Sequence, residues 1–214
     1  LLGLAADSLR LVTLPRARIS RPFVVVGSIG SGRSTALLLI AAQLADRQVA
    51  VCCNDTSPLA ACPGAVRLPR DDQDHAVAVL DSLGSSGSPP HLVCDDVDLL
   101  AEGPLSTRLD ALARDDAGND AALAIGASTD AVAAAFRGPL AHARRSRCGL
   151  LLGAVTRHDA EVLGVTLAGR APSRIGDPPG RGWLVVAGNG QRLQLADPTG
   201  QQLENQLAGL ELSA

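Results

Sequence analysis

The chain has 214 residues, of which 46% are hydrophobic and 19% charged, so it has enough apolar material for one substantial core. Its formal net charge is −3, and all nineteen basic residues are Arg because the sequence has no Lys. This balance argues against a DNA-wrapping surface, and no apolar run reaches the length of a membrane span. We expect one domain over residues 1–198 and a C-terminal tail over residues 199–214.

Strand and helix patterns alternate along the first part of the chain. We expect strands at residues 23–26, 49–53, 66–68, 91–94 and 121–125, and helices at residues 34–45, 75–83 and 105–114. After residue 149 we expect short strands at 150–152, 183–186 and 192–195, with a hairpin signal at Gly188-Asn189-Gly190. The predicted fold class is α/β, a mostly parallel sheet with helices on both faces and an antiparallel C-terminal edge.

A glycine-rich segment, GSIGSGRST at residues 27–35, lies between the first of these strands and a helix. It follows the phosphate-binding pattern G-x-x-x-x-G-K-[ST] except that Arg33 stands in the place of the Lys. Such a loop turns backbone N–H groups and a helix N-terminus toward phosphate, and we expect Ser34 to hold Mg²⁺. The predicted ATP-binding residues are Gly27, Ser28, Ile29, Gly30, Ser31, Gly32, Arg33, Ser34 and Thr35. A glycine-rich turn without a ligand is the alternative.

The apolar run Leu92-Val93-Cys94 ends in Asp95 and Asp96, the form expected of a Walker B segment. Asp95 is predicted to lie near Mg²⁺. Asp96 is the candidate catalytic residue, because it stands where many P-loop ATPases keep a glutamate that orients water. Alternatively, these carboxylates and Asp98 cap the following helix.

Two substitutions at this site lower the expected rate of ATP hydrolysis. Arg33 brings a planar guanidinium in place of a compact ammonium, and this exchange is not conservative. Asp96 is one methylene shorter than glutamate. We therefore predict weak or absent hydrolysis, with ATP and Mg²⁺ bound weakly if at all.

Several other polar residues are less informative. Ser128 and Thr129 follow the strand predicted at 121–125, where they could face the phosphate-binding crevice, but we favour an N-cap for a helix beginning near Asp130. The Arg residues at 144, 145 and 147 are expected to form a solvated surface cluster. Five Cys residues without C-x-x-C spacing are expected as small buried side chains in a reduced, cytosolic compartment.

The order of several motifs resembles the FtsK/SpoIIIE family of RecA-like P-loop ATPases, and in particular the last ATPase module of EccC, the motor of type VII secretion. The resemblance covers nearly the whole chain. It rests on GSIGSGRST at 27–35, LVCDDVDLL at 92–100, AAFRGPLAHARRSRCGLLL at 134–152, LGV at 163–165 and PPGRGWLV at 178–185.

This resemblance implies a membrane-associated hexameric motor of unequal tandem modules, of which the later ones are degenerate and serve regulation or substrate recognition. The implied partners are other modules of the motor and secreted helical-hairpin proteins, bound through their C-terminal signal. The implied location is cytoplasmic, in an inner-membrane-associated complex, with Arg137, Arg144 and Arg145 as candidate interface residues. Two alternatives remain, a DNA-translocating FtsK-type domain and a nucleotide-free structural module; nucleic acid is not the expected partner.

Overall fold

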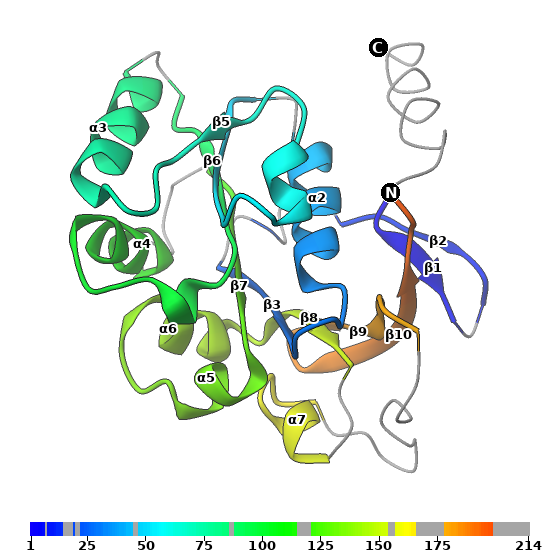
Figure 1. The fold of residues 1–214 in the computed structure, drawn as a ribbon. Helices are drawn as coiled ribbons and strands as arrows, with labels where there is room; N and C mark the ends of the chain where they lie inside the picture. The colour runs from blue at the N-terminus through cyan, green and yellow to red at the C-terminus, as the bar shows by residue number, and fades with distance from the viewer. Residues whose placement is uncertain are drawn as a thin grey trace.

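The computed structural model describes residues 1–6, 8–14, 19, 22–44, 47–85, 88–114, 121–153, 157–165 and 178–198. These residues form a ten-stranded mixed sheet in the order β2-β1-β10-β9-β8-β3-β7-β6-β4-β5 (Figure 1). The predicted tail over residues 199–214 lies outside the described part of the chain.

Six strands form the parallel part of the sheet: β3 (Phe23–Gly27), β4 (Val49–Cys52), β5 (Val66–Arg67), β6 (His91–Cys94), β7 (Leu123–Ala127) and β8 (Cys148–Leu152). All but β5 are buried along their whole length, as expected of parallel strands covered on both faces. The predicted parallel sheet is confirmed. The strand expected at 121–125 begins two residues later, since the backbone N–H of Ala122 donates to His91 Nδ1 at 2.9 Å.

The antiparallel part consists of β9 (Arg181–Val186), β10 (Asn189–Leu195), β1 (Gly3–Ala5) and β2 (Leu11–Val12). The predicted hairpin joins β9 to β10, but its turn is Ala187–Gly188, one residue earlier than the glycine signal suggests. Both turn residues have positive φ, 51° and 79°, which matches the twist of two-residue hairpins. β1 and β2, which the sequence analysis does not predict, extend the sheet beyond β10.

Helices cover both faces of the sheet, as predicted. One face carries α2 (Arg33–Gln43) and the 3₁₀ turn η1 (Pro58–Ala61), which share a core cluster. The other face carries α3 (Gln73–Gly84), α4 (Pro104–Arg114), α5 (Thr129–Ala134) and α6 (Gly138–Ser146), with η2 (Val97–Leu99) and α7 (Arg157–Glu161). In Figure 1, α3, α4, α6 and α5 follow the left side of the molecule, and α2 lies on the opposite side of β7.

The core is divided by the sheet into two clusters, because successive side chains of a strand point to opposite faces. In β3, Phe23 and Val25 pack toward α2, whereas Val24 and Val26 pack toward the opposite face of the sheet, which carries α3, α4, α5 and α6. All five cysteines are buried, as expected of small apolar side chains. Within the described residues, no helix is long and apolar enough to cross a membrane.

Candidate functional site

The predicted phosphate-binding loop connects β3 to α2 at the carboxyl edge of the parallel strands, the edge where open α/β sheets bind ligands. Gly30 and Gly32 have φ of 79° and 94°, in the left-handed region that favours glycine. A Cβ on Gly27 would lie 2.3 Å from Ser31 Oγ, and one on Gly32 would lie 2.8 Å from the backbone N of Gly180. Backbone conformation and close packing therefore require glycine where the motif has it.

The loop leaves the N-terminus of α2 open. Gly32 stands at the N-cap and has no side chain to cap the helix, and the first turn contains no acidic residue. The first N–H groups of an α-helix lack intrahelical partners and favour anions. Ser28, Ile29 and Gly30 form the exposed tip, with Ile29 99% exposed, and Thr35 is half-buried in the first turn. The backbone of this loop fits an anionic phosphate.

The acidic strand end meets the loop directly. Asp95, which is 1% exposed, follows β6 and accepts hydrogen bonds from Ser34 Oγ and, at 3.3 Å, from Ser57 Oγ. Asp96 Oδ2 accepts from Asn54 Nδ2 at 3.1 Å. The structure thus brings together the predicted Ser34, Asp95 and Asp96, and it adds two residues that follow β4.

Arg33 links the loop to both carboxylates. Its Nε donates to Asp95 Oδ1 at 3.2 Å, and its Nη2 donates to Asp96 Oδ1. Its Nη1 donates to the carbonyl oxygen of Gly27 at 3.0 Å. The guanidinium is therefore directed away from the exposed loop tip, and its side chain is 11% exposed.

A second arginine holds the backbone of the acidic pair. Arg70 donates from Nη1 to the carbonyl oxygen of Asp95 at 2.9 Å and from Nη2 to that of Asp96 at 2.6 Å. Asp96 has a φ of 50°, which is uncommon for a residue other than glycine. Arg70 therefore supports a backbone conformation that is unfavourable by itself, and its place just after β5 is the only sequence signal that could have indicated it.

Burial is the main cause that raises the pKa of Asp96, and the negative charge of Asp95 adds to it. The positive charges of Arg33 and Arg70 oppose this increase in the pKa. Removal of either arginine is expected to favour the protonated form of Asp96.

The alternative that the acidic residues cap the next helical turn is not supported. Asp96 occupies the N-cap position of η2 but makes no side-chain capping hydrogen bond. Asp98 Oδ2 instead accepts from Ser128 Oγ at 2.6 Å, and Ser128 itself accepts from the backbone N of Ala131 at 3.3 Å. Ser128 is thus the N-cap of α5, as predicted, and Thr129 is the first residue of this helix.

The PPGRGWLV motif at residues 178–185 lies beside the phosphate-binding loop. Gly180 donates from its backbone N to the carbonyl oxygen of Ser31 at 2.8 Å, and Gln194 Nε2 donates to the carbonyl oxygen of Pro179 at 3.0 Å. The turn before β9 therefore supports the phosphate-binding loop from the antiparallel side of the sheet.

The basic cluster before β8 is only partly a surface feature. Arg145 and Arg147 are exposed, but Arg144 is half-buried and donates from Nη1 to the carbonyl oxygen of Ala133 at 2.8 Å. Arg144 therefore ties α6 to α5, which corrects the expectation of a fully solvated cluster.

The side chains as arranged do not fit Mg²⁺. Ser34 donates to Asp95 and still keeps lone pairs for a metal, but the guanidinium of Arg33 lies on both carboxylates. In the described part of the chain, no group of three or more His, Cys, Asp or Glu residues is placed to hold a metal ion. The backbone of the loop is suited to an anion, whereas Asp95 and Asp96 are already paired with the guanidinium of Arg33.

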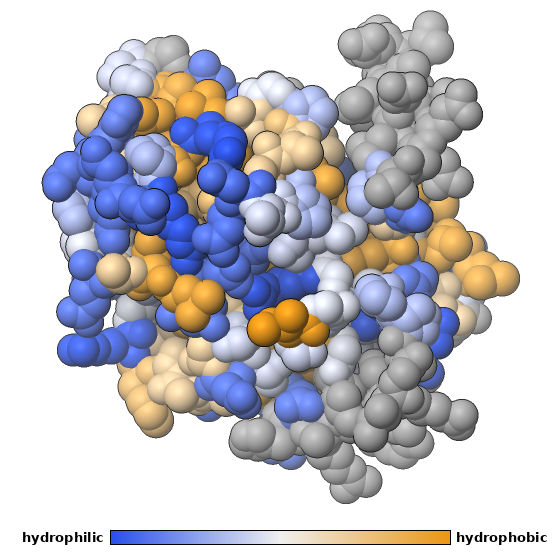
Figure 2. All heavy atoms as spheres, viewed as in Figure 1, coloured by the Kyte–Doolittle hydropathy of each residue, from blue (hydrophilic) through white to orange (hydrophobic). Residues whose placement is uncertain are grey.

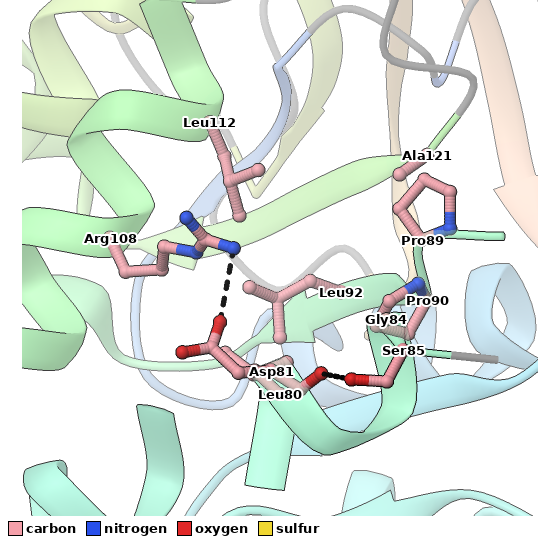
Figure 3. A pocket seen from close by; sticks show the side chains of 10 residues that line it. All are labelled: Leu80, Asp81, Gly84, Ser85, Pro89, Pro90, Leu92, Arg108, Leu112 and Ala121. Atoms are coloured by element: carbon pink, nitrogen blue, oxygen red, sulfur yellow. Dashed lines mark hydrogen bonds and ion pairs between the residues drawn. The ribbon is translucent and has the colours of Figure 1, made fainter. Parts of the chain in front are cut away.

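Hollows in the described part of the chain also lie outside the loop. One of about 350 Å³ lies between α3, α4 and the starts of β6 and β7, with the Asp81–Arg108 ion pair at its side (Figure 3). A second, of about 520 Å³, follows β4 and β5 beside Arg70, and a third, of about 580 Å³, lies between η2, α4, α5 and α6. None of the three includes a residue of the phosphate-binding loop.

No family model and no curated protein matches the sequence, but several solved structures match its fold. The cytoplasmic domain of the type VII secretion ATPase EccC from Thermomonospora curvata has a TM-score of 0.66 and 21% identity over 93% of this chain. EssC (ATPases 2 and 3) from Geobacillus thermodenitrificans has a TM-score of 0.69 and 12% identity over 92%. The chain has the fold of these ATPase modules.

A further match is the pCW3 conjugation coupling protein TcpA, solved with ATPγS, with a TM-score of 0.61 and 14% identity over 98% of this chain. The chain spans 26% of the EccC cytoplasmic domain, 40% of the EssC chain and 69% of TcpA. The predicted RecA-like fold and the resemblance to FtsK/SpoIIIE-type ATPases are confirmed at the level of the fold.

Proposed function

We propose that residues 1–198 form a degenerate ATPase module of a type VII protein secretion motor, which binds ATP weakly or statically and serves regulation or substrate recognition. The observation that carries this proposal is the position of Arg33, which replaces the P-loop Lys and contacts both Asp95 and Asp96. A carboxylate that is paired with a guanidinium and with Asn54 is poorly placed to orient a water molecule. Weak or absent hydrolysis follows.

Titration with a fluorescent ATP analogue, beside a phosphate-release assay, tests this proposal. We expect weak binding and little turnover by the unmodified chain. Arg33→Lys should bind about tenfold more tightly, a change of about 1.4 kcal/mol, because a compact ammonium can turn toward phosphate and release Asp96. Arg108→Lys, on an exposed ion pair, is the matched control and should bind like the unmodified chain.

The outcomes separate the alternatives. Rapid turnover by the unmodified chain would contradict the degeneracy. Absence of binding by both the unmodified chain and Arg33→Lys would favour the nucleotide-free structural module. Duplex DNA binding that weakens steeply with salt would favour a translocase, a class kept open by the likeness to a conjugation coupling protein.

The groove between η2, α4, α5 and α6 is our candidate for substrate recognition. One of the structural neighbours, EccC (ATPases 2 and 3), was solved in complex with a signal sequence peptide; it has a TM-score of 0.64 and 20% identity. The groove is lined by apolar, uncharged polar and charged residues: Val97, Asp98, Leu100, Glu102, Gly103, Ser106, Thr107, Asp110, Arg114, Ala131, Ala134, Ala135, Arg137, Gly138, Pro139 and Leu140. We propose that it receives the C-terminal signal of a secreted helical-hairpin protein.

Two large apolar side chains beside this groove are exposed to solvent. Leu99 is 71% exposed and Phe136 is 88% exposed, and the sequence neighbours of each line the groove. In Figure 2, apolar atoms gather at the lower left of the molecule, over α5. Exposed aromatic residues beside a concavity are typical of peptide-binding sites.

Fluorescence anisotropy with a labelled C-terminal signal peptide tests the groove. Phe136→Ala should weaken binding about tenfold or more, because buried aromatic anchors carry much of an interface's affinity. Leu11→Ala is the control. Leu11 is 70% exposed on β2, which is the edge strand at the end of the sheet away from the groove. Equal affinities of the two variants would place the peptide elsewhere.

The remaining partners follow from the same proposal. We propose that the module works beside other ATPase modules of one motor, assembled as a hexamer, with Arg137 and Arg145 available for contacts on the surface. It would lie in the cytoplasm, as part of an inner-membrane-associated complex.

A further inference from the structure

The carboxylate oxygens of the acidic pair are all engaged by donors of the protein. Asp95 Oδ1 accepts from Arg33 Nε and from the backbone N of Asp96, the latter at 2.9 Å, and Oδ2 accepts from two hydroxyl groups. Asp96 Oδ1 accepts from Arg33 Nη2 and Oδ2 accepts from Asn54. The acidic pair is therefore satisfied without any ligand.

The guanidinium of Arg33 has hydrogen-bond acceptors on three sides. Its planar fork reaches Asp95, Asp96 and the carbonyl oxygen of Gly27 from three different nitrogens. A lysine ammonium is a single point charge and could not span these three acceptors in the same way. Arg33 thus joins the first residue of the loop to the end of β6.

The position of this charge conflicts with a divalent metal. Mg²⁺ requires near-octahedral oxygen ligands at about 2.0–2.1 Å, and here a fixed positive charge lies on both candidate carboxylates. The side chains of Arg33 and Asp95 are 11% and 1% exposed, so solvent screens the repulsion between a guanidinium and a metal poorly. A metal could approach only if Arg33 moved.

We propose that Arg33 is the resident cation of this site: its guanidinium takes the place of the divalent metal between the P-loop and the acidic pair. The site is consequently metal-independent, and Arg33 is a positioning residue that fixes the loop on β6. The ligand class left to the loop is an anion held by backbone N–H groups without a metal. This inference goes beyond the proposed function and holds whether or not the chain serves secretion.

Thermal unfolding of the 214-residue chain, in EDTA and in millimolar Mg²⁺, tests the proposal, with Mn²⁺ binding measured by electron paramagnetic resonance. The unmodified chain should have the same Tm in both conditions and should leave Mn²⁺ free. Arg33→Ala should lower the Tm in EDTA by about 5 °C or more, because it leaves a buried carboxylate unpaired. In this variant Mg²⁺ should restore part of the loss, and Mn²⁺ should bind.

Matched variants keep the test informative. Arg108→Ala, which breaks an exposed ion pair, should change the Tm by about 2 °C or less. If Arg33→Ala does not fold, Arg33→Lys replaces it, with a smaller loss of Tm and the same recovery in Mg²⁺.

Either of two results would overturn the proposal. The first is a Tm of the unmodified chain that rises more with Mg²⁺ and ATP together than with ATP in EDTA, which would show that Arg33 moves aside for a metal. The second is a loss of Tm in the Arg33 variant no larger than that in Arg108→Ala. Neither measurement depends on a secreted substrate, so failure here and failure of the proposed function are distinguishable.

Discussion

At Gly32, both the backbone conformation and the close packing require a residue without a Cβ. Its φ of 94° is unfavourable for any residue with a Cβ, and its place against Gly180 leaves no room for one. Gly32→Ala should therefore destabilise the fold by about 1–3 kcal/mol. It should also loosen the turn at Pro178, Pro179 and Gly180, and urea unfolding with hydrogen exchange at Gly180 measures both effects.

Gly84 is the control for this substitution. It is the last residue of α3, its φ is not positive, and a Cβ there would meet no atom within 4 Å. Gly84→Ala should be neutral or should stabilise the chain by up to about 1 kcal/mol. If Gly32→Ala were equally tolerated, the loop would not have the tight conformation described above.

The sequence predicts the residues of the site better than their contacts. The glycine spacing identifies the loop because the motif has glycine at positions where the backbone conformation or close packing requires it. The contacts of Arg33 with Asp95 and Asp96 could not be predicted, because these carboxylates lie more than 60 positions away along the chain and the contacts depend on which strands are neighbours. Asn54, Ser57 and Arg70 were missed for the same reason, since each acquires its role only because β4 lies between β6 and β5 and all three strands end at the same edge of the sheet.

At the scale of elements, short apolar runs alternating with helical segments indicated the parallel strands, whereas local hydrogen bonds determined the boundaries. The helix expected at 75–83 begins at Gln73, because Asp72 accepts from the backbone N of His75 at 3.0 Å and forms the N-cap. The hairpin turn falls on Ala187–Gly188 because this choice pairs Val186 with Asn189. In both cases the sequence contains the signal, Asp72 in one and Gly188 in the other, within two residues of the observed boundary.

The first two strands could not be predicted from local pattern. β1 and β2 have three and two residues, too short for the alternation that identifies a strand. β1 pairs with β10, which lies at the far end of the described chain, and β2 pairs with β1. The predicted antiparallel C-terminal edge is thus confirmed, but a hairpin from the N-terminal residues lies outside it.

At the scale of the whole molecule, residues near the two ends of the described chain are neighbours in the sheet. Gly3 pairs with Leu195, and the backbone N of Ala196 donates to the carbonyl oxygen of Leu2 at 3.0 Å. The side chain of Leu2 is fully buried in the cluster that also contains Phe23 and Ile40. The core under α2 therefore includes residues from both ends, so we expect the N-terminal hairpin to unfold together with the parallel strands.

Leu2→Ala tests this coupling, because truncation of a buried leucine should cost about 2–5 kcal/mol if the hairpin belongs to the cooperative core. Leu4→Ala is the matched control on the same strand: Leu4 is 42% exposed, and its truncation should cost less than about 1 kcal/mol. Urea unfolding followed by the fluorescence of Trp183, on β9, reports the midpoint for the sheet as a whole. If the two substitutions lowered this midpoint equally, the hairpin would be an appendage that opens before the core, because burial at Leu2 would then contribute nothing to global stability.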